Sequence, residues 1–584
     1  MTFIMKTILD RYMPRTEFSS YEDFIENYRV EAPDNFNFGF DVVDAWAELD
    51  PDKLALWWLD EAGGELKYTF SDIKRLGNKA ANFFTGLGIK KGDFVMLILK
   101  QRHEYWLCAT ALHKIGAVVI PATPQLTSKD IAYRNNAAGI SAILAYASDT
   151  RLLGEIRKSL DESPTVKHVI CVAGADAGAG ARLDAADCAA ATGRQFEFLD
   201  FDAGIKNCPE DFPRPEGAAA TRISDSFLVY FTSGTTGMPK MVMHDGSYPL
   251  GHITTAKYWQ RACDGALHLT ALADSGWAKF GWGKIYGQWL CGAAIFAYDM
   301  DRFAPVKMLE VMQKYPITTY CAAPTMYRFM IQEDVRSYDL SSIKHYTTAG
   351  EPLNPEVYNQ WKAMTGLGIA EGFGQSESSV LLANFEWFEP KPGSMGRPAP
   401  LYKIAIVDED LNVCDEGIEG QVVVRGVDNY MPPGLLKYYY GDKALNDEAF
   451  RKGCYNTGDV AWMDSDGHYW FVWRVDDIIK SSGYRIGPFE VESALLEHEA
   501  VVECAVTASP DPIRGQIVKA SIVLARGYSA GDGLVKELQD HVKRVTAPYK
   551  YPRIIEFVNE LPKSIGGKIK RGEIRAQNNA GDAE

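Results

Sequence analysis

YFTSGTTGMPK, residues 230–240, is the stretch of sequence that decides the fold. It begins inside the apolar run FLVYFT (227–232), which predicts a buried strand. Glycine backbone groups, hydroxyl side chains and one ammonium in such a short span can wrap a polyphosphate. The stretch therefore predicts a phosphate-binding loop, built from Thr232, Ser233, Gly234, Thr235, Thr236, Gly237 and Lys240.

This loop does not follow the Walker pattern. A Walker loop reads GxxxxGK[ST] and runs directly into a helix. Here Lys240 follows Pro239, and a proline favours extended geometry for the residue before it, Met238. The alternative, an ordinary turn rich in glycine and threonine, stays open at this point.

Two further apolar runs, FVMLILK (94–100) and VVIPAT (118–123), predict buried strands between longer helical patterns, as in an α/β fold. Beyond Arg474 the pattern changes to a helix at 488–498, strands at 501–508 and 518–525, a helix at 534–545 and a strand at 554–558. About 110 residues suffice for an independent α+β core. We expect a large domain at residues 1–475 and a small one at 476–584, hinged near Asp476.

The amino-acid composition of the chain bears on its partners and its cellular compartment. The chain has 61 basic and 77 acidic residues, a net charge of -16, which disfavours nucleic acid and anionic lipid as partners. Its 10 cysteines are scattered without a CxxC pair, which excludes a zinc ribbon and indicates a reduced, cytoplasmic protein. Early charges such as Lys6 and Arg11 argue against a signal peptide, and no apolar run is long enough for a membrane span.

TSGTTGMPK resembles the signature of the adenylate-forming superfamily of acyl-CoA synthetases, luciferases and nonribosomal-peptide adenylation domains. Further motifs follow in the family's order along nearly the whole chain, and SSGYRIGPFEVE (481–492), SPDPIRG (509–515) and TAPYKYPR (546–553) are most similar to medium-chain acyl-CoA synthetases. The resemblance implies an α/β adenylation domain followed by a mobile lid domain. It also implies a carboxylic acid, ATP, Mg²⁺ and coenzyme A as ligands.

The resemblance assigns a nucleotide site. Residues 349–352 are similar to the family's adenine-flanking loop, and 372–377 to its YGxTE motif, with Phe373 and Ser376 keeping the aromatic face and the hydroxyl. Glu377 would then ligate Mg²⁺. Asp459 and Arg474 would hold the ribose, although Asp459 also suits an ordinary turn. With the phosphate loop, the implied ATP-binding set is Gly350, Glu351, Pro352, Gly372, Phe373, Gly374, Gln375, Ser376, Asp459, Arg474 and Lys568.

The lid carries the catalytic lysine and the thiol site that the resemblance implies. Lys568, in PKSIGGKIKR (562–571), would meet carboxylate and α-phosphate oxygens, and a solvated basic tail is the alternative. The implied catalytic set is Lys240, Ser376, Glu377 and Lys568. Gly483 lacks a side chain, so a pantetheine arm can pass close to its backbone. The implied CoA-binding set is Ser482, Gly483, Tyr484, Arg485, Arg514, Lys543 and Arg553, whose basic members also suit a solvated surface.

ADSGWAKFGW (273–282) resembles the segment that lines the family's acid pocket, together with Gly350. Trp277, Phe280 and Trp282 suit either a plain core or a pocket closed at its far end, and Lys279 either reaches solvent or caps that pocket. A closed pocket predicts short, medium-chain or branched acids. Neither the exact acid nor the oligomeric state follows from the sequence.

Three other functions compete with acid–CoA ligation. An enzyme that loads a carrier protein would share the motifs, but no carrier domain with its serine-bearing helix is attached. A luciferase-like oxygenase has no supporting feature in the sequence. A regulator that binds AMP without turnover would keep the phosphate loop and lose Lys568 or Glu377, and both are present.

Overall fold

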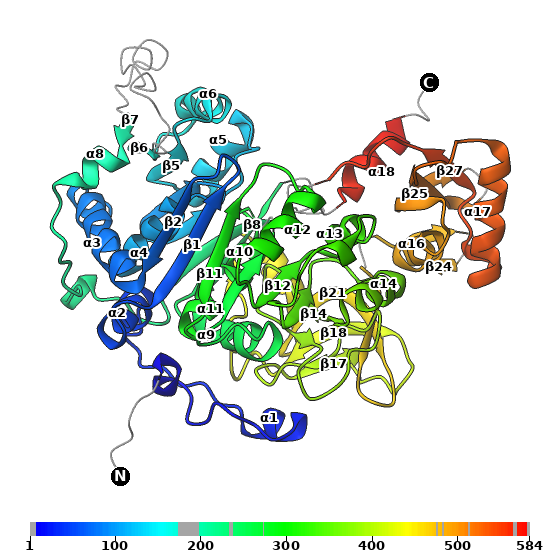
Figure 1. Cartoon of the computed structure of the whole chain (residues 1–584), viewed down its shortest axis with the longest axis horizontal. Helices are drawn as coiled ribbons and strands as arrows, with labels where there is room; N and C mark the ends of the chain where they lie inside the picture. Colours follow the sequence, from blue (N-terminus) through cyan, green and yellow to red (C-terminus); the bar gives the residue numbers. More distant parts are fainter. Residues whose placement is uncertain are drawn as a thin grey trace.

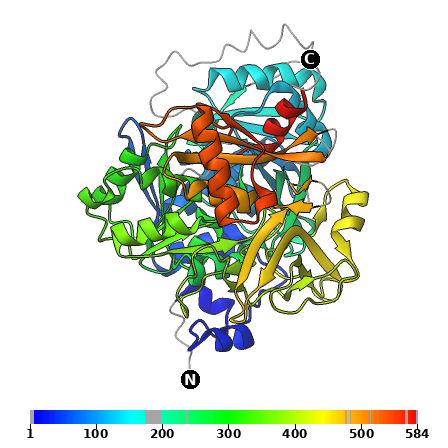
Figure 2. The ribbon, with the colours of Figure 1, turned by 90° about the vertical axis from the view of Figure 1, so that its right-hand side faces the viewer.

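The computed structural model describes residues 7–172, 198–232, 238–271, 274–474, 477–481, 484–511, 514–563 and 569–580. For residues 579 and 580 this description covers the backbone alone. Two large sheets with helices packed around them form most of the chain, and a smaller sheet follows them (Figure 1). The C-terminal elements form a separate unit at one end of the molecule (Figures 1 and 2). The predicted α/β architecture is confirmed.

The first large sheet has the strand order β19-β9-β8-β4-β3-β5-β6-β7 in the described residues. Its strands are β3 (Phe94–Ile98), β4 (Val118–Pro121), β5 (Ala142–Tyr146), β6 (His168–Val172), β7 (Phe198–Asp200), β8 (Ser226–Thr232), β9 (Lys240–Asp245) and β19 (Tyr438–Tyr439). The predicted strands at 94–100, 118–123 and 227–232 are all present. β8 pairs antiparallel with β9, so the glycine-rich stretch joins two strands and does not start a helix. This connection excludes a Walker loop.

The second large sheet has the order β16-β15-β14-β13-β12-β10-β11-β1-β2. Its strands are β1 (Leu54–Asp60), β2 (Glu65–Thr69), β10 (Leu267–Thr270), β11 (Ala294–Asp299), β12 (Thr319–Ala322), β13 (His345–Thr348), β14 (Ile369–Phe373), β15 (Leu382–Ala383) and β16 (Arg397–Pro398). β13 and β14 are parallel neighbours, so the loops after them emerge at the same edge of the sheet. The predicted 349–352 and 372–377 segments are therefore adjacent in space.

Helices pack around these sheets (Figure 1). They include α3 (Phe70–Gly86), α4 (Glu104–Ile115), α5 (Ser128–Ala138), α6 (Thr150–Ser159), α10 (Ala278–Gly283), α12 (Pro305–Lys314), α13 (Pro324–Met330) and α14 (Pro355–Thr365). Every residue of α4 is buried, as expected for a helix enclosed on all sides. Asn354 followed by Pro355 is a sequence pattern that predicts a helix start, and α14 begins there. The Asn354 side chain accepts a hydrogen bond from the Glu356 N–H, and Pro355 occupies the first turn.

A smaller sheet follows, formed by β17 (Ile404–Val407), β18 (Gly420–Arg425), β20 (Phe450–Arg451), β21 (Cys454–Met463) and β22 (Tyr469–Arg474). The C-terminal unit contains β23 (Ile479–Ser481), β24 (Tyr484–Ile486), α16 (Pro488–Leu496), β25 (Val501–Asp511), β26 (Gly515–Leu524), α17 (Asp532–Val545), β27 (Ile554–Phe557) and α18 (Arg571–Ala580). Its buried core includes Val491, Leu495 and Leu538. The predicted hinge, Asp476, lies outside the described residues, between β22 of one sheet and β23 of another.

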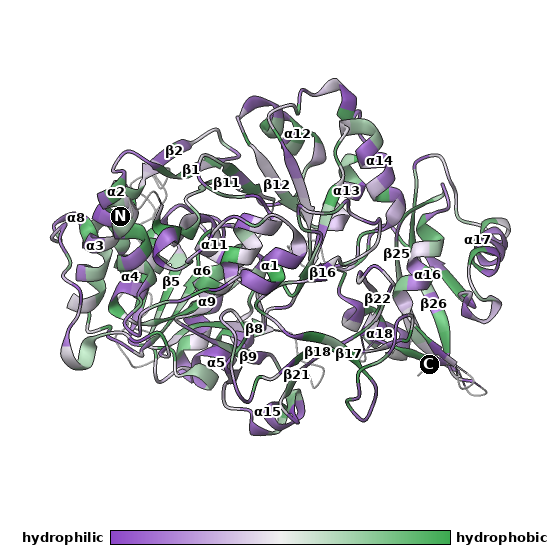
Figure 3. Ribbon diagram, turned by 90° about the horizontal axis from the view of Figure 1, so that it is seen from below, coloured by the Kyte–Doolittle hydropathy of each residue, from purple (hydrophilic) through white to green (hydrophobic). Residues whose placement is uncertain are grey.

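Hydropathy follows this arrangement (Figure 3). Strands such as β17 and β18 are largely apolar, whereas the outer helix α17 shows much polar surface. α17 still buries Leu538 and Val542, which share one helical face. No helix in the described part of the chain is long and apolar enough to cross a membrane.

Gly396, beside β16, provides a test of this packing. Its φ is +88°, and a Cβ there would lie 2.1 Å from the carbonyl carbon of Ala383. Gly417 has a similar φ of +76° but open space around it. Gly417→Ala should therefore cost about 1–3 kcal/mol of backbone strain, and Gly396→Ala distinctly more. Melting temperatures of the two variants give the comparison, and equal losses would contradict this packing.

Candidate functional site

Several predicted residues fall outside the described part of the chain, namely Ser233, Gly234, Thr235, Thr236, Gly237, Asp476, Ser482, Gly483 and Lys568. Their roles stay predictions. The residues that flank the phosphate loop are described, and Thr232 pairs with Lys240 in the β8–β9 register. The two ends of the loop therefore lie side by side, as a loop closed around a ligand requires.

The loop after β13 is held from three sides. Gly350 adopts a φ of +107°, in the region that favours glycine. The Lys279 ammonium donates to the carbonyl of Ala349 at 3.0 Å. Glu351 accepts hydrogen bonds from the N–H and hydroxyl of Thr325 and lies 3.5 Å from Arg328. The Glu351 carboxylate thus fixes this loop, with Pro352 following it, to the start of α13.

Burial opposes ionisation of Glu351, but Arg328 and the Thr325 hydrogen bonds outweigh it, so the pKa of this carboxyl lies below its usual value. Arg571, in the C-terminal unit, acts in the same direction. The carboxylate is therefore charged, as its contacts require.

The loop after β14 contains the predicted Phe373–Glu377 motif. The ring nitrogen Nε2 of His244 lies 2.8 Å from the Ser376 carbonyl oxygen. Burial lowers the pKa of His244 to about 3, so its ring is neutral. Because a carbonyl only accepts, the proton of that neutral ring is on Nε2. Leu436 N–H donates to the Glu377 carbonyl at 2.7 Å and Tyr439 donates to Glu377 Oε1 at 3.1 Å.

Asp459 and Arg474 pair across β21 and β22, and Arg474 Nη1 lies 3.2 Å from Asp459 Oδ1. Asp459 is only 2% exposed. The Gln375 amide reaches it from the loop after β14, with Nε2 at 2.5 Å from Asp459 Oδ2, and Tyr455 donates to Gln375 Oε1 at 2.8 Å. The structure therefore brings Gln375, Asp459 and Arg474 together, as the family resemblance implies.

Two glycines of the predicted motif are explained by neighbouring tryptophans. A Cβ on Gly372 would lie 2.5 Å from the indole of Trp259, and one on Gly374 would lie 2.4 Å from Trp282. The Trp282 indole N–H donates to the Ser378 carbonyl at 3.1 Å. The indole rings thus set the course of the backbone of the predicted nucleotide motif.

The three aromatic residues of the predicted acid pocket point to different places. Trp277 is 38% exposed. Phe280 is 1% exposed and packs on Tyr105 and Trp106 of α4, with ring centroids at 4.6 and 5.2 Å. Trp282 packs against the nucleotide motif. Trp277 precedes α10, and Phe280 and Trp282, two positions apart in that helix, lie on different sides of it, so the three rings do not line one pocket.

Three of the predicted CoA residues, Tyr484, Lys543 and Arg553, contact two tyrosines that are not in the predicted set, Tyr549 and Tyr551. Tyr484 stacks on Tyr549 at 4.2 Å, and both rings are exposed. Tyr551 lies between Lys543, whose ammonium is 4.4 Å from the ring centroid, and Arg553, which donates to its hydroxyl at 2.7 Å. TAPYKYPR (546–553) contained this signal, because alternating aromatic and basic residues suit a nucleotide.

The other two predicted CoA residues are held by acidic neighbours. Arg485 is exposed and lies 3.8 Å from Glu409 of the large unit. The backbone N–H of Arg514 donates to Asp511 at 2.7 Å.

Residues on either side of 564–568, the segment that contains Lys568, are described. Lys563 and Ile569, on either side of the 564–568 segment, form an isolated bridge. The Lys563 ammonium lies 4.9 Å from the ring centroid of Phe329 in α13. α13 also holds Glu351 of the adenine-flanking loop. The flanks of the lysine segment and the predicted nucleotide site therefore meet at the same helix.

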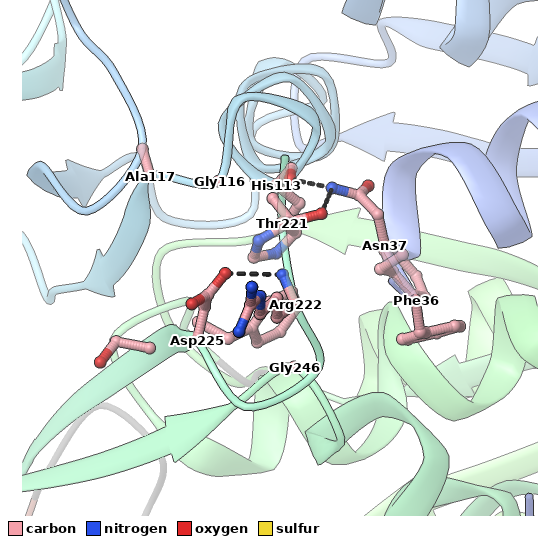
Figure 4. Close-up of a pocket in the computed structure, with 12 residues that line it drawn as sticks. Phe36, Asn37, His113, Gly116, Ala117, Thr221, Arg222, Asp225 and Gly246 are labelled. Carbon is pink, nitrogen blue, oxygen red and sulfur yellow. Dashed lines mark hydrogen bonds between the residues drawn. The ribbon is translucent and has the colours of Figure 1, made fainter. Parts of the chain in front are cut away.

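A small cavity lies elsewhere, between the N-terminal segment, α4 and residues 221–227 (Figure 4). Its volume is about 20 Å³, which holds about one water molecule. Asn37 crosses it and donates to the His113 carbonyl at 2.7 Å and the Thr221 hydroxyl at 3.2 Å. None of the predicted site residues lines this cavity, and its volume is too small for an acid or a nucleotide.

Comparison with known proteins finds two family models that match successive parts of the chain. A family described as AMP-binding enzyme matches residues 43–440, and its C-terminal domain matches residues 490–568. The chain is 40% identical to acyl-coenzyme A synthetase ACSM3, mitochondrial, of Rattus norvegicus, over 96% of this chain and 93% of the relative. It is 41% identical to acyl-coenzyme A synthetase ACSM4, mitochondrial, of the same species, over 95% and 93%.

Solved structures give the same picture. The anthranilate CoA ligase AuaEII in complex with anthranoyl-AMP superposes with a TM-score of 0.82 at 25% identity, covering 95% of this chain and 99% of that one. The Brucella canis acyl-CoA synthetase superposes with a TM-score of 0.71 at 27% identity, covering 96% and 99%.

Asp459→Asn should weaken ATP binding. The change removes the charge that Arg474 faces and leaves the Gln375 amide opposite a donor. Hydrogen bonds to charged groups are worth about 1.5–3 kcal/mol, so affinity should fall roughly 10-fold to 100-fold, as measured by titration calorimetry. Asp466→Asn, which changes an exposed carboxylate in the turn between β21 and β22, is the matched control. Unchanged ATP affinity in a folded Asp459→Asn protein would remove Asp459 from the nucleotide site.

Proposed function

The chain belongs to the AMP-binding enzyme family, and from this premise we propose that it is an acid–CoA ligase, converting a carboxylic acid, ATP and CoA to acyl-CoA, AMP and pyrophosphate. The observation that carries this function is the similarity to acyl-coenzyme A synthetases at about 40% identity along nearly the whole chain. The paired Asp459 and Arg474 beside Gln375 support it.

In the first half-reaction a carboxylate oxygen of the acid attacks the α-phosphorus of ATP. A bond forms between that oxygen and phosphorus, the bond to the bridging oxygen breaks, and pyrophosphate leaves. Carboxylate and triphosphate repel each other, so the site must supply positive charge and directed donors. We assign this task to Lys240, Lys568 and the donors of the phosphate loop, with Ser376 at the α-phosphate.

Mg²⁺ fits this site through Glu377. Mg²⁺ binds through one or two carboxylates together with substrate phosphates. No cluster of three or more histidine, cysteine or acidic side chains among the described residues could hold a metal alone. Glu377 offers a carboxylate that is partly exposed and already oriented by Tyr439. When bound, the ion would neutralise charge on the polyphosphate.

In the second half-reaction the CoA sulfur attacks the acyl carbonyl, the thiol proton leaves, and AMP departs. We propose that the domain at residues 476–584 rotates about Asp476 between the steps. Lys563 facing Phe329 supports an arrangement in which the lysine segment is at the site. The exposed Tyr484–Tyr549 stack, with Lys543 and Arg553 around Tyr551, suits the nucleotide of CoA.

The acid is proposed to be short, medium-chain or branched. Trp282 packs against Gly374 of the nucleotide motif, so its ring occupies space next to the reacting end of the site. A long chain would need that space or another route. The relatives named above are mitochondrial enzymes. The cytoplasmic location of this chain stays a prediction from its cysteine pattern.

Lys568→Ala should abolish adenylation and spare thioester formation from a preformed acyl-adenylate, because each half-reaction uses a different face of the lid. Losing one pre-placed charge-stabilising group costs about 100-fold to 1,000-fold in rate. Pyrophosphate release reports the first step, and acyl-CoA formation from synthetic acyl-adenylate reports the second. Lys570→Ala, an exposed lysine paired with Glu573, is the control. Equal loss of both steps in a folded Lys568→Ala protein would sink this assignment.

A panel of C2 to C12, branched and aryl acids tests the ligase itself, with pyrophosphate release measured with CoA. Each methylene that reaches apolar surface adds ~0.8 kcal/mol, so specificity should climb with length and then fall where the tail meets a ring. Trp282→Gly should shift the optimum to longer acids. It should also slow all acids, because the bond to Ser378 is lost.

Two outcomes would revise this account. The wild type could prefer palmitate over butyrate, 2-methylbutyrate, hexanoate and octanoate. That result would contradict an acid pocket closed at its far end. Faster transfer to a phosphopantetheine carrier than to free CoA would favour the carrier-loading function.

A further inference from the structure

Tyr439 sits in a short segment whose backbone is fixed on both sides. β19 pairs with β9, which starts at Lys240, and the register sets Tyr439 opposite Val242. On its other side, the Tyr439 N–H donates to the Asn446 side chain at 2.7 Å, and the Asn446 amide donates back to the Tyr439 carbonyl at 2.8 Å. The position of this ring is therefore set before any ligand binds.

From this fixed position the hydroxyl of Tyr439 donates to Glu377 Oε1 at 3.1 Å. Leu436, in the same segment, donates its N–H to the Glu377 carbonyl at 2.7 Å. The Lys240 ammonium lies 5.9 Å from the centroid of the Tyr439 ring. One segment thus holds the backbone and the carboxylate of Glu377 and contacts the lysine at the end of the phosphate loop.

Tyr439 is buried, with 5% of its surface exposed, so its contact with Glu377 is shielded from water. A hydrogen bond to a carboxylate in such surroundings is stronger than one at the surface. The neighbour Tyr438 is 41% exposed. Adjacent residues of a strand point to opposite faces, so the two tyrosines differ in surroundings while sharing a backbone.

We infer that Tyr439 is a positioning residue for adenylation, which holds Glu377 Oε1 so that the second carboxylate oxygen stays available to the Mg²⁺–nucleotide complex. This role rests on the proposed function. Tyr439 touches neither acid nor nucleotide in this account and acts through Glu377. Groups that orient a metal-binding carboxylate typically matter about 10-fold to 100-fold for metal affinity.

Tyr439→Phe tests this role, because the variant keeps the ring and loses only the hydroxyl. ATP binding is measured by titration calorimetry in Mg²⁺ and again in EDTA. The gain in ATP affinity that Mg²⁺ brings should fall about 10-fold or more, while affinity in EDTA stays within about twofold. Thioester formation from preformed acyl-adenylate should be unchanged. Tyr438→Phe should give wild-type values in both titrations and in the thioester assay.

A merely structural role predicts a different pattern, with equal loss of ATP binding in both arms and a lower melting temperature. That pattern, or an undiminished Mg²⁺ effect in Tyr439→Phe, overturns the inference. In a Glu377→Gln background, Tyr439→Phe should add no further loss, because the carboxylate it serves is gone.

Asn446→Ala provides a second variant should Tyr439→Phe not fold. It removes the hydrogen bonds that hold the Tyr439 backbone, so the gain in ATP affinity that Mg²⁺ brings should fall by a smaller factor. An unchanged gain would contradict the inference. The calorimetry needs no acid substrate. If no acid releases pyrophosphate while the Mg²⁺-dependent arm behaves as expected, the ligase assignment fails and the role of Tyr439 stands.

Discussion

The antiparallel pairing of β8 with β9 is the constraint on which the site depends. It places Thr232 beside Lys240 and so closes the phosphate loop at its base. The free edge of β9 then accepts β19, which carries Tyr439. A segment about 200 residues later in the chain is thereby brought to the end of the loop. Had a helix followed β8, as in a Walker loop, β9 would not lie between β8 and β19.

Close contact between glycine backbone and indole rings sets the second part of the site. Trp259 and Trp282 pack where side chains on Gly372 and Gly374 would otherwise lie. These two positions alternate along the chain, so both face the rings, while Phe373 faces the other way. The two glycines therefore pack against the core, and Phe373, which is predicted to contact the adenine, lies on the opposite face of the same strand end.

The buried Asp459 and His244 side chains differ in charge. Asp459 is almost fully buried, and its charge is matched by Arg474 and the Gln375 amide, as a buried carboxylate requires. His244, by contrast, is buried without charge, so it donates a hydrogen bond to the Ser376 carbonyl without placing a second cation near Lys240.

The sequence by itself determined the α/β class, the strands before the phosphate loop, the capped start of α14 and the set of motifs that mark an adenylate-forming enzyme. Short-range patterns and motif spacing carry these features, because each depends on residues close together in the chain. Only the tertiary structure decided that Gln375 reaches Asp459, that Phe280 belongs to the core around α4 while Trp282 supports the nucleotide motif, and that Tyr439 holds Glu377. These contacts join residues up to 175 positions apart, as with Tyr105 and Phe280, and nothing in local sequence encodes such a pairing. Their geometry follows from strand order and register, which exist only once the chain has folded.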